Sequence, residues 1–352
     1  MEKINKIKRL INCRGLDGYL IPKNDEFFGE YISENKDRLK FISNFSGSFG
    51  FALILKKKNY LFVDGRYTLQ AKVQSGKLFK IITIPEKYPH DVLKEKKLKI
   101  GFDPKLYTKK TLKIFFNRTS CKFLPISENL IDKLWIKKKY NNTKKFYILP
   151  EKVTGQNYKI KINKLTNILI GKKVDLQFTS ASENIAWLLN IRGEDSDFTP
   201  LPNSYLIINS NKKIKLFCDL KKINSTFKKK FKNIEIIDIK HTNLFLSKVK
   251  NKQILIDASS CSIYFESILK KNNKIVEFID PIYFLKSIKS KVEINNIIKS
   301  HIFDGAALTK FLIWLKKNYK KINLNEISAQ NKLLKFRKKN KSFRSLSFPT
   351  IS

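Results

Sequence analysis

Histidine is scarce in this chain of 352 residues, which contains only His90, His241 and His301. The three stand in unrelated segments, and none has the H-E-x-x-H spacing that places two zinc ligands on one face of a helix. His301 falls within a long helical pattern, where a solvated or hydrogen-bonded imidazole is the expected role. The histidines therefore predict no metal site.

Cysteine is also scarce, and its spacing excludes two further classes of protein. Cys13, Cys121, Cys218 and Cys261 lie far apart, with no C-x-x-C pair among them. Neither a zinc knuckle nor a disulfide framework is indicated, because both need closely spaced or paired cysteines. We expect buried or free thiols.

Long apolar runs are missing. No run approaches the roughly 20 residues that cross a bilayer, and the start MEKINKIKRLINCRG lacks the apolar stretch of a secretory signal. These absences predict a cytoplasmic protein with no membrane partner.

Acidic residues are far outnumbered, since 72 Lys and Arg against 30 Asp and Glu give a formal net charge of +42. Lysines that neutralise phosphates release counterions and so bind polyanions without sequence preference. The lysines occur in every segment, however, and no zinc finger, RRM-type aromatic motif or basic zipper accompanies them. We predict non-specific adhesion to polyanions and no specific nucleic-acid partner.

Two short motifs resemble binding loops without completing them. GEDSDF places Asp195 and Asp197 two residues apart, but the glycine and the closing glutamate of an EF-hand are missing. SGSFG, residues 46–50, fits neither the P-loop nor the G-x-S-x-G pattern, which makes Ser48 a poor nucleophile. We predict ordinary loops, and no catalytic residue, metal site or cofactor held by this chain.

Hydrophobic residues, 42% of the chain, follow an α/β pattern that occurs twice. The first pass predicts a helix over 2–14, a strand over 17–22, a polar loop, a hairpin over 51–66, a helix over 66–75, a strand over 79–84, a helix over 90–97 and a strand over 98–103. The second predicts a helix over 156–171, a strand over 174–179, a hairpin over 204–219, strands over 234–239 and 253–258, and a helix over 262–271. The repeated order predicts two similar mixed-sheet α/β domains.

After residue 288 the pattern becomes helical. A helix over 292–317 carries an apolar stripe, and a second helix follows, with Asn323 and Glu326 at the spacing of a cap and its third helical residue. The stripe consists of Ile294, Ile298, Ile302, Gly305, Leu308, Leu312 and Leu315. Nothing in the remaining FRSLSFPTIS can supply a sheet for this stripe, so we expect an incomplete third domain.

Taken in order, these segments resemble the long, three-domain form of the Xaa-Pro aminopeptidases, the aminopeptidase P family. YLIPKNDEFFGEYISENKDRLKFISNFSGSFG with LFVDGRYTLQA looks like the creatinase-type N-terminal domain, and SENIAWLLNIRGEDSDFTPLPNSYLII with KLFCD looks like the second domain. LKSIKSKVEINNIIKSHIFDGAALTKFLIWL resembles the entry into the catalytic domain, which has the pita-bread fold. The resemblance implies a creatinase-type domain over 1–135, a linker over 136–150, a second such domain over 151–288 and a truncated pita-bread segment over 289–352.

The resemblance also implies an activity, the removal of the first residue from peptides whose second residue is proline. In the family, two aspartates, one histidine and two glutamates of the catalytic domain hold two divalent metal ions, manganese or zinc. Those ligands would follow SFPTIS, so we expect a chain that is inactive by itself and acts on peptides only if a catalytic domain is supplied. A homodimer is a candidate assembly. Two alternatives stay open: a non-catalytic partner subunit of a split peptidase, and a polyanion-binding protein that reuses the scaffold.

Six residues in the matching motifs are candidates for shaping substrate access or for anchoring loops: Tyr31, Arg38, Asp64, Arg66, Arg192 and Asp195. In the family, the first two domains shape access to the active site and support dimer contacts. Hydrogen bonds that hold loops to the sheet are the alternative role for each of the six.

Overall fold

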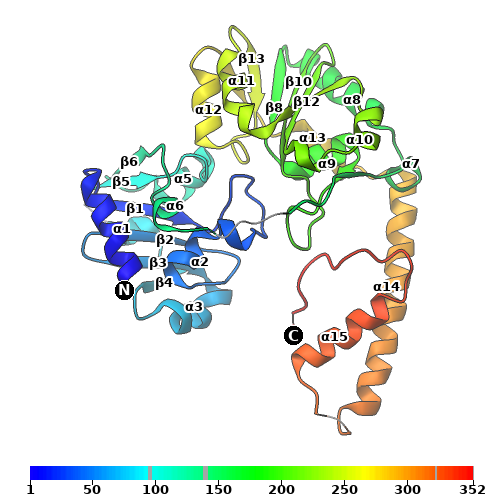
Figure 1. Ribbon diagram of the computed structural model, residues 1–352, viewed down its shortest axis with the longest axis horizontal. Helices are drawn as coiled ribbons and strands as arrows, with labels where there is room; N and C mark the ends of the chain where they lie inside the picture. Colours follow the sequence, from blue (N-terminus) through cyan, green and yellow to red (C-terminus); the bar gives the residue numbers. More distant parts are fainter. Residues whose placement is uncertain (94–96, 138–141, 322, 352) are drawn as a thin grey trace.

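The computed structural model describes residues 1–93, 97–137, 142–321 and 323–351. Two mixed α/β domains, each built around a six-stranded sheet, are followed by two helices that extend from the second domain (Figure 1). The two mixed-sheet domains predicted from the repeated sequence pattern are therefore confirmed.

The first sheet has the strand order β4-β3-β2-β1-β5-β6. Its strands are β1 (Gly18–Pro22), β2 (Phe51–Leu55), β3 (Asn59–Asp64), β4 (Lys80–Ile84), β5 (Lys99–Phe102) and β6 (Lys122–Pro125). The helices of this domain are α1 (Glu2–Cys13), α2 (Arg38–Ser43), α3 (Thr68–Ser75), α4 (Pro89–Val92), α5 (Lys109–Phe116) and α6 (Leu130–Leu134). Alternate residues of β1 lie in two different apolar cores. Tyr19 and Ile21 belong to one core and Leu20 belongs to the other, so the sheet is covered on both faces.

The second sheet repeats this topology as β12-β11-β10-β8-β13-β14. Its strands are β8 (Leu176–Thr179), β10 (Ser204–Asn209), β11 (Ile214–Cys218), β12 (Ile234–Asp238), β13 (Gln253–Ile256) and β14 (Lys274–Glu277), and β7 (Tyr147–Ile148) pairs separately with β9 (Ile191–Arg192). The helices are α7 (Glu151–Thr154), α8 (Tyr158–Gly171), α9 (Ser182–Leu189), α10 (Ser225–Lys230), α11 (Thr242–Lys248), α12 (Ile263–Lys270) and α13 (Pro281–Ser287). In both sheets the first strand pairs antiparallel with the hairpin and parallel with the fifth strand.

Each domain ties its last helix to the sheet through an aspartate at the same position, directly after the fifth strand. In the first, Asp103 after β5 accepts a 2.8 Å hydrogen bond from Nδ2 of Asn129, which caps α6. In the second, Asp257 after β13 accepts a 3.0 Å hydrogen bond from the N–H of Asp280, which caps α13. All four residues are buried, where an unpaired polar group is costly, so each contact ties helix and sheet together.

The two domains meet through equivalent segments. Thr108 and Ser262, the N-caps of α5 and α12, form an isolated antiparallel bridge. The N–H of Ile263 donates to the carbonyl of Tyr107 at 2.9 Å. Lys109 adds an ion pair with Glu277 at 2.9 Å, so backbone and charge both fix this contact.

The polar loop predicted between the first strand and the hairpin contains a helix. α2 begins after Asp37, whose Oδ1 accepts a 3.0 Å hydrogen bond from the N–H of Lys40. This N-cap satisfies a backbone donor that would otherwise have no partner, and it permits a short helix in a segment without a long apolar period.

One predicted helix cap is wrong, and one predicted helix lies only partly within the described residues. The N-cap of α15 (Glu326–Arg337) is Asn325 and not Asn323, because Oδ1 of Asn325 accepts a 2.9 Å hydrogen bond from the N–H of Ser328. Of the helix predicted over 90–97, the structure describes the part that belongs to α4, and residues 94–96 lie outside the described residues. Residues 138–141 of the predicted linker also lie outside the described residues.

α14 (Lys291–Asn318) starts at a capping box and extends from the second domain, and α15 packs back along it (Figure 1). Nε of Arg337 on α15 lies 2.6 Å from Oδ1 of Asp304 on α14. Much of the apolar stripe is exposed, with Ile298 at 53% and Ile302 at 64%. None of the described helices is long and apolar enough to span a membrane.

We predict that a chain ending at Ser290 melts at the same temperature as the full chain or higher, and scatters less light. Burying an apolar side chain is worth roughly 1.5–3 kcal/mol, and an exposed stripe forgoes that stabilisation and promotes association. Thermal denaturation and light scattering of the two chains measure the difference. A melting temperature several degrees lower in the shorter chain would show that α14 and α15 stabilise the domains.

Candidate functional site

The six candidate residues do not converge on one site. Arg38 lies in a buried group of charges in the first domain, and Asp64 pairs with Arg66 at the surface. Tyr31 lies where a loop of the first domain contacts the second domain. Arg192 and Asp195 hold the loop that follows β9.

Arg38 is buried and binds two carboxylates. Its Nε and Nη2 donate to Oδ1 and Oδ2 of Asp132 on α6 at 2.9 and 2.8 Å, and Nη2 also lies 2.7 Å from Oε1 of Glu26. Burial by itself would lower the pKa of the guanidinium, but the hydrogen bonds to Asp132 and the charge of Glu26 outweigh it and raise the pKa. Such bidentate pairing fixes the position of α2 relative to α6 and to residue 26.

Further ion pairs close the β1–α2 loop, which we define as residues 23–37. Nζ of Lys23 lies 2.5 Å from Oδ2 of Asp37, and both side chains are buried. Nζ of Lys36 lies 2.9 Å from Oε2 of Glu26 and 3.3 Å from Oδ2 of Asp25. Burial would raise the pKa of Glu26, but the charges of Lys36 and Arg38 hold it well below its usual range.

This loop contacts the second domain. The ring of Phe27 stacks on Tyr205 with a centroid distance of 5.1 Å, and the Tyr205 hydroxyl donates to the carbonyl of Glu26 at 3.0 Å. The carbonyl of Tyr31 accepts a 2.7 Å hydrogen bond from Oγ of Ser196. Tyr31 therefore lies at the domain interface.

Asp195 and Arg192 hold the loop that follows β9. Asp195 is buried, and its carboxylate accepts a 2.7 Å hydrogen bond from the N–H of Asn203 and pairs with Lys222. Nη1 of Arg192 donates to the carbonyl of Ala186 at 3.0 Å, near the carboxyl end of α9, where a cation is favoured by the helix dipole. Burial lowers the pKa of Arg192.

Asp64 and Arg66 form a surface pair after β3. Nη2 of Arg66 lies 2.7 Å from Oδ2 of Asp64, and the Arg66 side chain is 66% exposed. The hydrogen bonds from Arg66 lower the pKa of Asp64. An exposed pair of this kind contributes little to stability.

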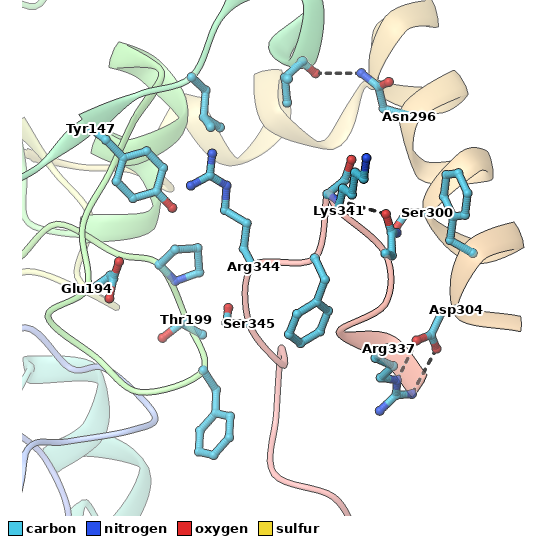
Figure 2. A pocket seen from close by; sticks show the side chains of 18 of the residues that line it. Tyr147, Glu194, Thr199, Asn296, Ser300, Asp304, Arg337, Lys341, Arg344 and Ser345 are labelled. Atoms are coloured by element: carbon cyan, nitrogen blue, oxygen red, sulfur yellow. Dashed lines mark hydrogen bonds and ion pairs between the residues drawn. The ribbon is translucent and has the colours of Figure 1, made fainter. Parts of the chain in front are cut away.

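A cleft of about 1420 Å³ lies between the second domain, α14 and the segment after α15 (Figure 2). Its basic residues are Lys144, Lys152, Lys299, Arg337, Lys341 and Arg344, and its acidic residues are Glu194, Asp197 and Asp304. Lys144 pairs with Glu194 and Arg337 with Asp304, which leaves a surplus of positive charge. The guanidinium of Arg344 lies 5.4 Å from the ring centre of Tyr147.

Sequence spacing does not reveal this cleft. Its one signal is the basic run RKKNKSFR, residues 337–344, which does not stand out from the general excess of lysine. Folding brings this run opposite the loop of residues 194–200, a juxtaposition that sequence spacing does not reveal.

The described residues do not fit a metal centre. No group of three His, Cys, Asp or Glu side chains among them is placed to hold an ion. His90 stacks on Tyr88, and Nδ1 of His301 lies 2.9 Å from the carbonyl of Ile297. These two histidines therefore make a ring contact and a hydrogen bond within the protein.

We predict that Arg38→Met lowers the free energy of unfolding by about 3 kcal/mol, because it removes the buried guanidinium that Glu26 and Asp132 share and leaves these partly buried carboxylates only Lys36 and Lys137 as partners. The control Arg66→Met removes an exposed cation of the same kind and should change stability by less than about 1 kcal/mol. Urea unfolding of both variants decides the matter, and equal effects would show that the buried pairing is not a main source of stability.

Comparisons with protein families identify both domains. Residues 3–134 match the model of the creatinase/prolidase N-terminal domain, and residues 137–293 match a second model of the same description. The chain is 31% identical over 377 residues to Xaa-Pro aminopeptidase 1 of Dictyostelium discoideum, covering 100% of this chain and 59% of that protein. It is 32% identical over 362 residues to Xaa-Pro aminopeptidase ApepP of Drosophila melanogaster, covering 96% of this chain and 58% of that protein.

A solved structure gives the same result. The X-prolyl aminopeptidase from Caenorhabditis elegans, described as a cytosolic enzyme with a di-nuclear active site, superposes with a TM-score of 0.89 at 26% identity. The match covers 99% of this chain and 61% of that one, so the chain spans about three fifths of the length of such relatives. The resemblance found in the sequence is confirmed: the chain belongs to the creatinase/prolidase N-terminal domain family, whose domain it contains twice, and over its length it is similar to the N-terminal part of Xaa-Pro aminopeptidases.

Proposed function

We propose that this chain forms the access-controlling N-terminal part of an Xaa-Pro aminopeptidase and does not hydrolyse peptides by itself. The observation that carries the proposal is the superposition of 99% of the chain on the Caenorhabditis elegans enzyme, together with the lack of a metal-ligand group among the described residues. The location given for that relative supports a cytoplasmic location here.

A di-nuclear centre supplies activated water and polarises the scissile carbonyl when its metals are bound. The described residues do not fit the two ions, manganese or zinc, that the resemblance implies, so we assign no hydrolytic step to them. In this proposal, hydrolysis requires residues that the relatives carry in the two fifths of their length outside the match.

The structure supports an access role in two ways. The loop of residues 194–200 lines the cleft and is fixed from behind by the bond from Ser196 to Tyr31, so one wall of the cleft is held by the domain interface. The surplus of positive charge in the cleft favours anionic groups such as a peptide carboxylate. We propose that the cleft attracts and orients short peptides.

We predict that the purified chain releases no amino acid from peptides with proline in second position, with or without added manganese, zinc or cobalt. The assay measures the liberated first residue, and an active Xaa-Pro aminopeptidase serves as the positive control in the same buffers. Metal-dependent release by preparations free of host peptidase would contradict the proposal.

Two alternatives share the scaffold. A partner subunit of a split peptidase would show the same inactivity, but would gain activity when a separate catalytic chain is added. A polyanion-binding protein would use the net charge of +42, and the basic lining of the cleft is the feature that favours it. A homodimer is compatible with each of these functions.

We predict that the chain binds double-stranded DNA weakly, with no preferred sequence, and that affinity falls steeply between low and physiological salt. Dispersed lysines act through counterion release, which depends on salt and not on base sequence. Competition titrations with unrelated duplexes at two salt concentrations measure this. Tight, sequence-selective retention at physiological ionic strength would favour the polyanion-binding alternative.

A further inference from the structure

Most of the apolar stripe of α14 is open to solvent. Its exposed members, each at least 41% exposed, are Ile294, Ile298, Ile302, Leu308 and Leu312. α15 and the segment after it lie on another side of α14, where Ala307 is the one buried residue of this helix (Figure 1). The stripe is therefore a helix face that the described part of the chain leaves without a partner.

The spacing of the stripe is that of a helix that pairs with another helix. Two sets of residues repeat at every seventh position: Ile298, Gly305 and Leu312, and Ile294, His301, Leu308 and Leu315. Two interleaved repeats of this kind form the contact face of a coiled coil. Nδ1 of His301, the one ionisable member, lies 2.9 Å from the carbonyl of Ile297, so this imidazole has a partner within its own helix.

Gly305 is an unfavourable residue for the middle of this long helix. Glycine is about 1 kcal/mol less favourable than alanine in a helix interior. It is useful where something must approach the backbone closely, but a Cβ added at Gly305 would meet nothing within 4 Å beyond the backbone of its own helix. The space that this glycine leaves is thus available to a side chain of a partner.

The charges of α14 favour an acidic partner. Its five lysines, none of which has an ion-pair partner among the described residues, are Lys291, Lys299, Lys310, Lys316 and Lys317. Both acidic residues of the helix are already engaged, since Glu293 accepts a 2.8 Å hydrogen bond from the N–H of Ser290 and Asp304 pairs with Arg337. An apolar face with free cations beside it is complementary to an apolar face with carboxylates beside it.

A second copy of α14 does not provide this complementarity. Lys291 and Lys316 stand at the two ends of the stripe. In an antiparallel pair of copies each of these lysines would lie near the other, and in a parallel pair each would lie near its own counterpart. Like charges oppose both arrangements.

A membrane surface also fits the stripe poorly. Helices that lie in a membrane interface carry Trp and Phe on their apolar face. The aromatic residues of α14 lie elsewhere, because Phe303 lines the cleft and the Trp314 ring is covered by Lys332 of α15 at 4.7 Å. The stripe itself is aliphatic and narrow, as in helix pairs.

We propose that the apolar stripe of α14 binds an acidic amphipathic α-helix of a partner protein. The stripe extends from Ile294 to Leu315, about 30 Å at 1.5 Å per residue, which a partner helix of about 20 residues would match. The partner places its apolar residues along the stripe, a large one of them at Gly305, and its carboxylates beside the lysines. The stripe and the cleft lie on different sides of α14, so this proposal does not depend on the peptidase proposal.

Titration of the full chain with three designed peptides tests the proposal. The first is a three-heptad helix with leucine at the first and fourth positions of each heptad and glutamate beside them. The second has lysine in place of glutamate, and the third has the composition of the first in an order that gives no apolar face. Because like charges repel, the first two peptides stay monomeric.

Fluorescence anisotropy of the labelled peptides at physiological salt should show saturable binding of the first and at least tenfold weaker binding of the other two. Equal binding of the third peptide would show that net charge alone acts, and equal binding of the second would show that apolar adhesion alone acts. Either result, or no saturable binding of the first peptide up to millimolar concentration, would overturn the proposal.

A matched pair of variants locates the binding. Leu312→Asn should weaken the first peptide at least tenfold, as expected for the lost burial of one leucine, while the melting temperature stays within a few degrees because Leu312 is exposed. The control Leu69→Asn changes a leucine that is 78% exposed on α3 and should leave the affinity unchanged. Equal effects of the two variants would place the peptide elsewhere and overturn the proposal.

Two further measurements distinguish the other occupants. In analytical ultracentrifugation, a discrete dimer that Leu312→Asn dissociates would assign the stripe to a second copy and overturn the proposal. Vesicles of phosphatidylserine and phosphatidylcholine should bind the wild type and Leu312→Asn equally, through dispersed lysines. Vesicle binding that Leu312→Asn abolishes would assign the stripe to a membrane surface and overturn the proposal.

Discussion

The buried pairing of Arg38 with Glu26 and Asp132 is the interaction on which the arrangement of this molecule depends. It joins α2 and α6 to the β1–α2 loop, and the pairs of Lys23 and Lys36 close the rest of that loop. The same loop then supplies the aromatic and backbone contacts to the second domain. Ion pairs inside the first domain therefore position the loop that contacts the second domain.

The repeat explains much of the remaining structure. Both sheets have the same strand order, and both tie the cap of their last helix to an aspartate after the fifth strand. The domains meet through equivalent positions, Thr108 and Ser262, as duplicated units can when one surface pairs with its own copy. The two copies differ at the third residue of the helix that follows, which is Thr111 in α5 and Phe265 in α12.

The sequence predicted the strands with clear apolar runs and missed the shortest helices. The strand over 17–22 and the hairpin over 204–219 were visible because their apolar runs are bounded by polar residues, whereas α2, α5, α6 and α9 are helices of five to eight residues, too short to repeat a helical period. The candidate residues came from motifs, but the partners of Arg38 and Tyr31 lie far away in sequence, at Asp132 and Ser196. The cleft likewise joins segments that are distant in sequence, and for that reason spacing alone could not reveal it.

The pairing of Arg38 with Glu26 and Asp132 fixes the two domains relative to each other through the β1–α2 loop. Spin labels on the exposed native Cys13 and on Lys230→Cys, with Cys121→Ser to prevent a third label, report the distance between the domains by pulsed electron resonance. We expect one narrow distance distribution in the otherwise wild-type chain and a clearly broader one when Arg38→Met is added. A distribution that is already broad, or one that Arg38→Met leaves unchanged, would contradict this account.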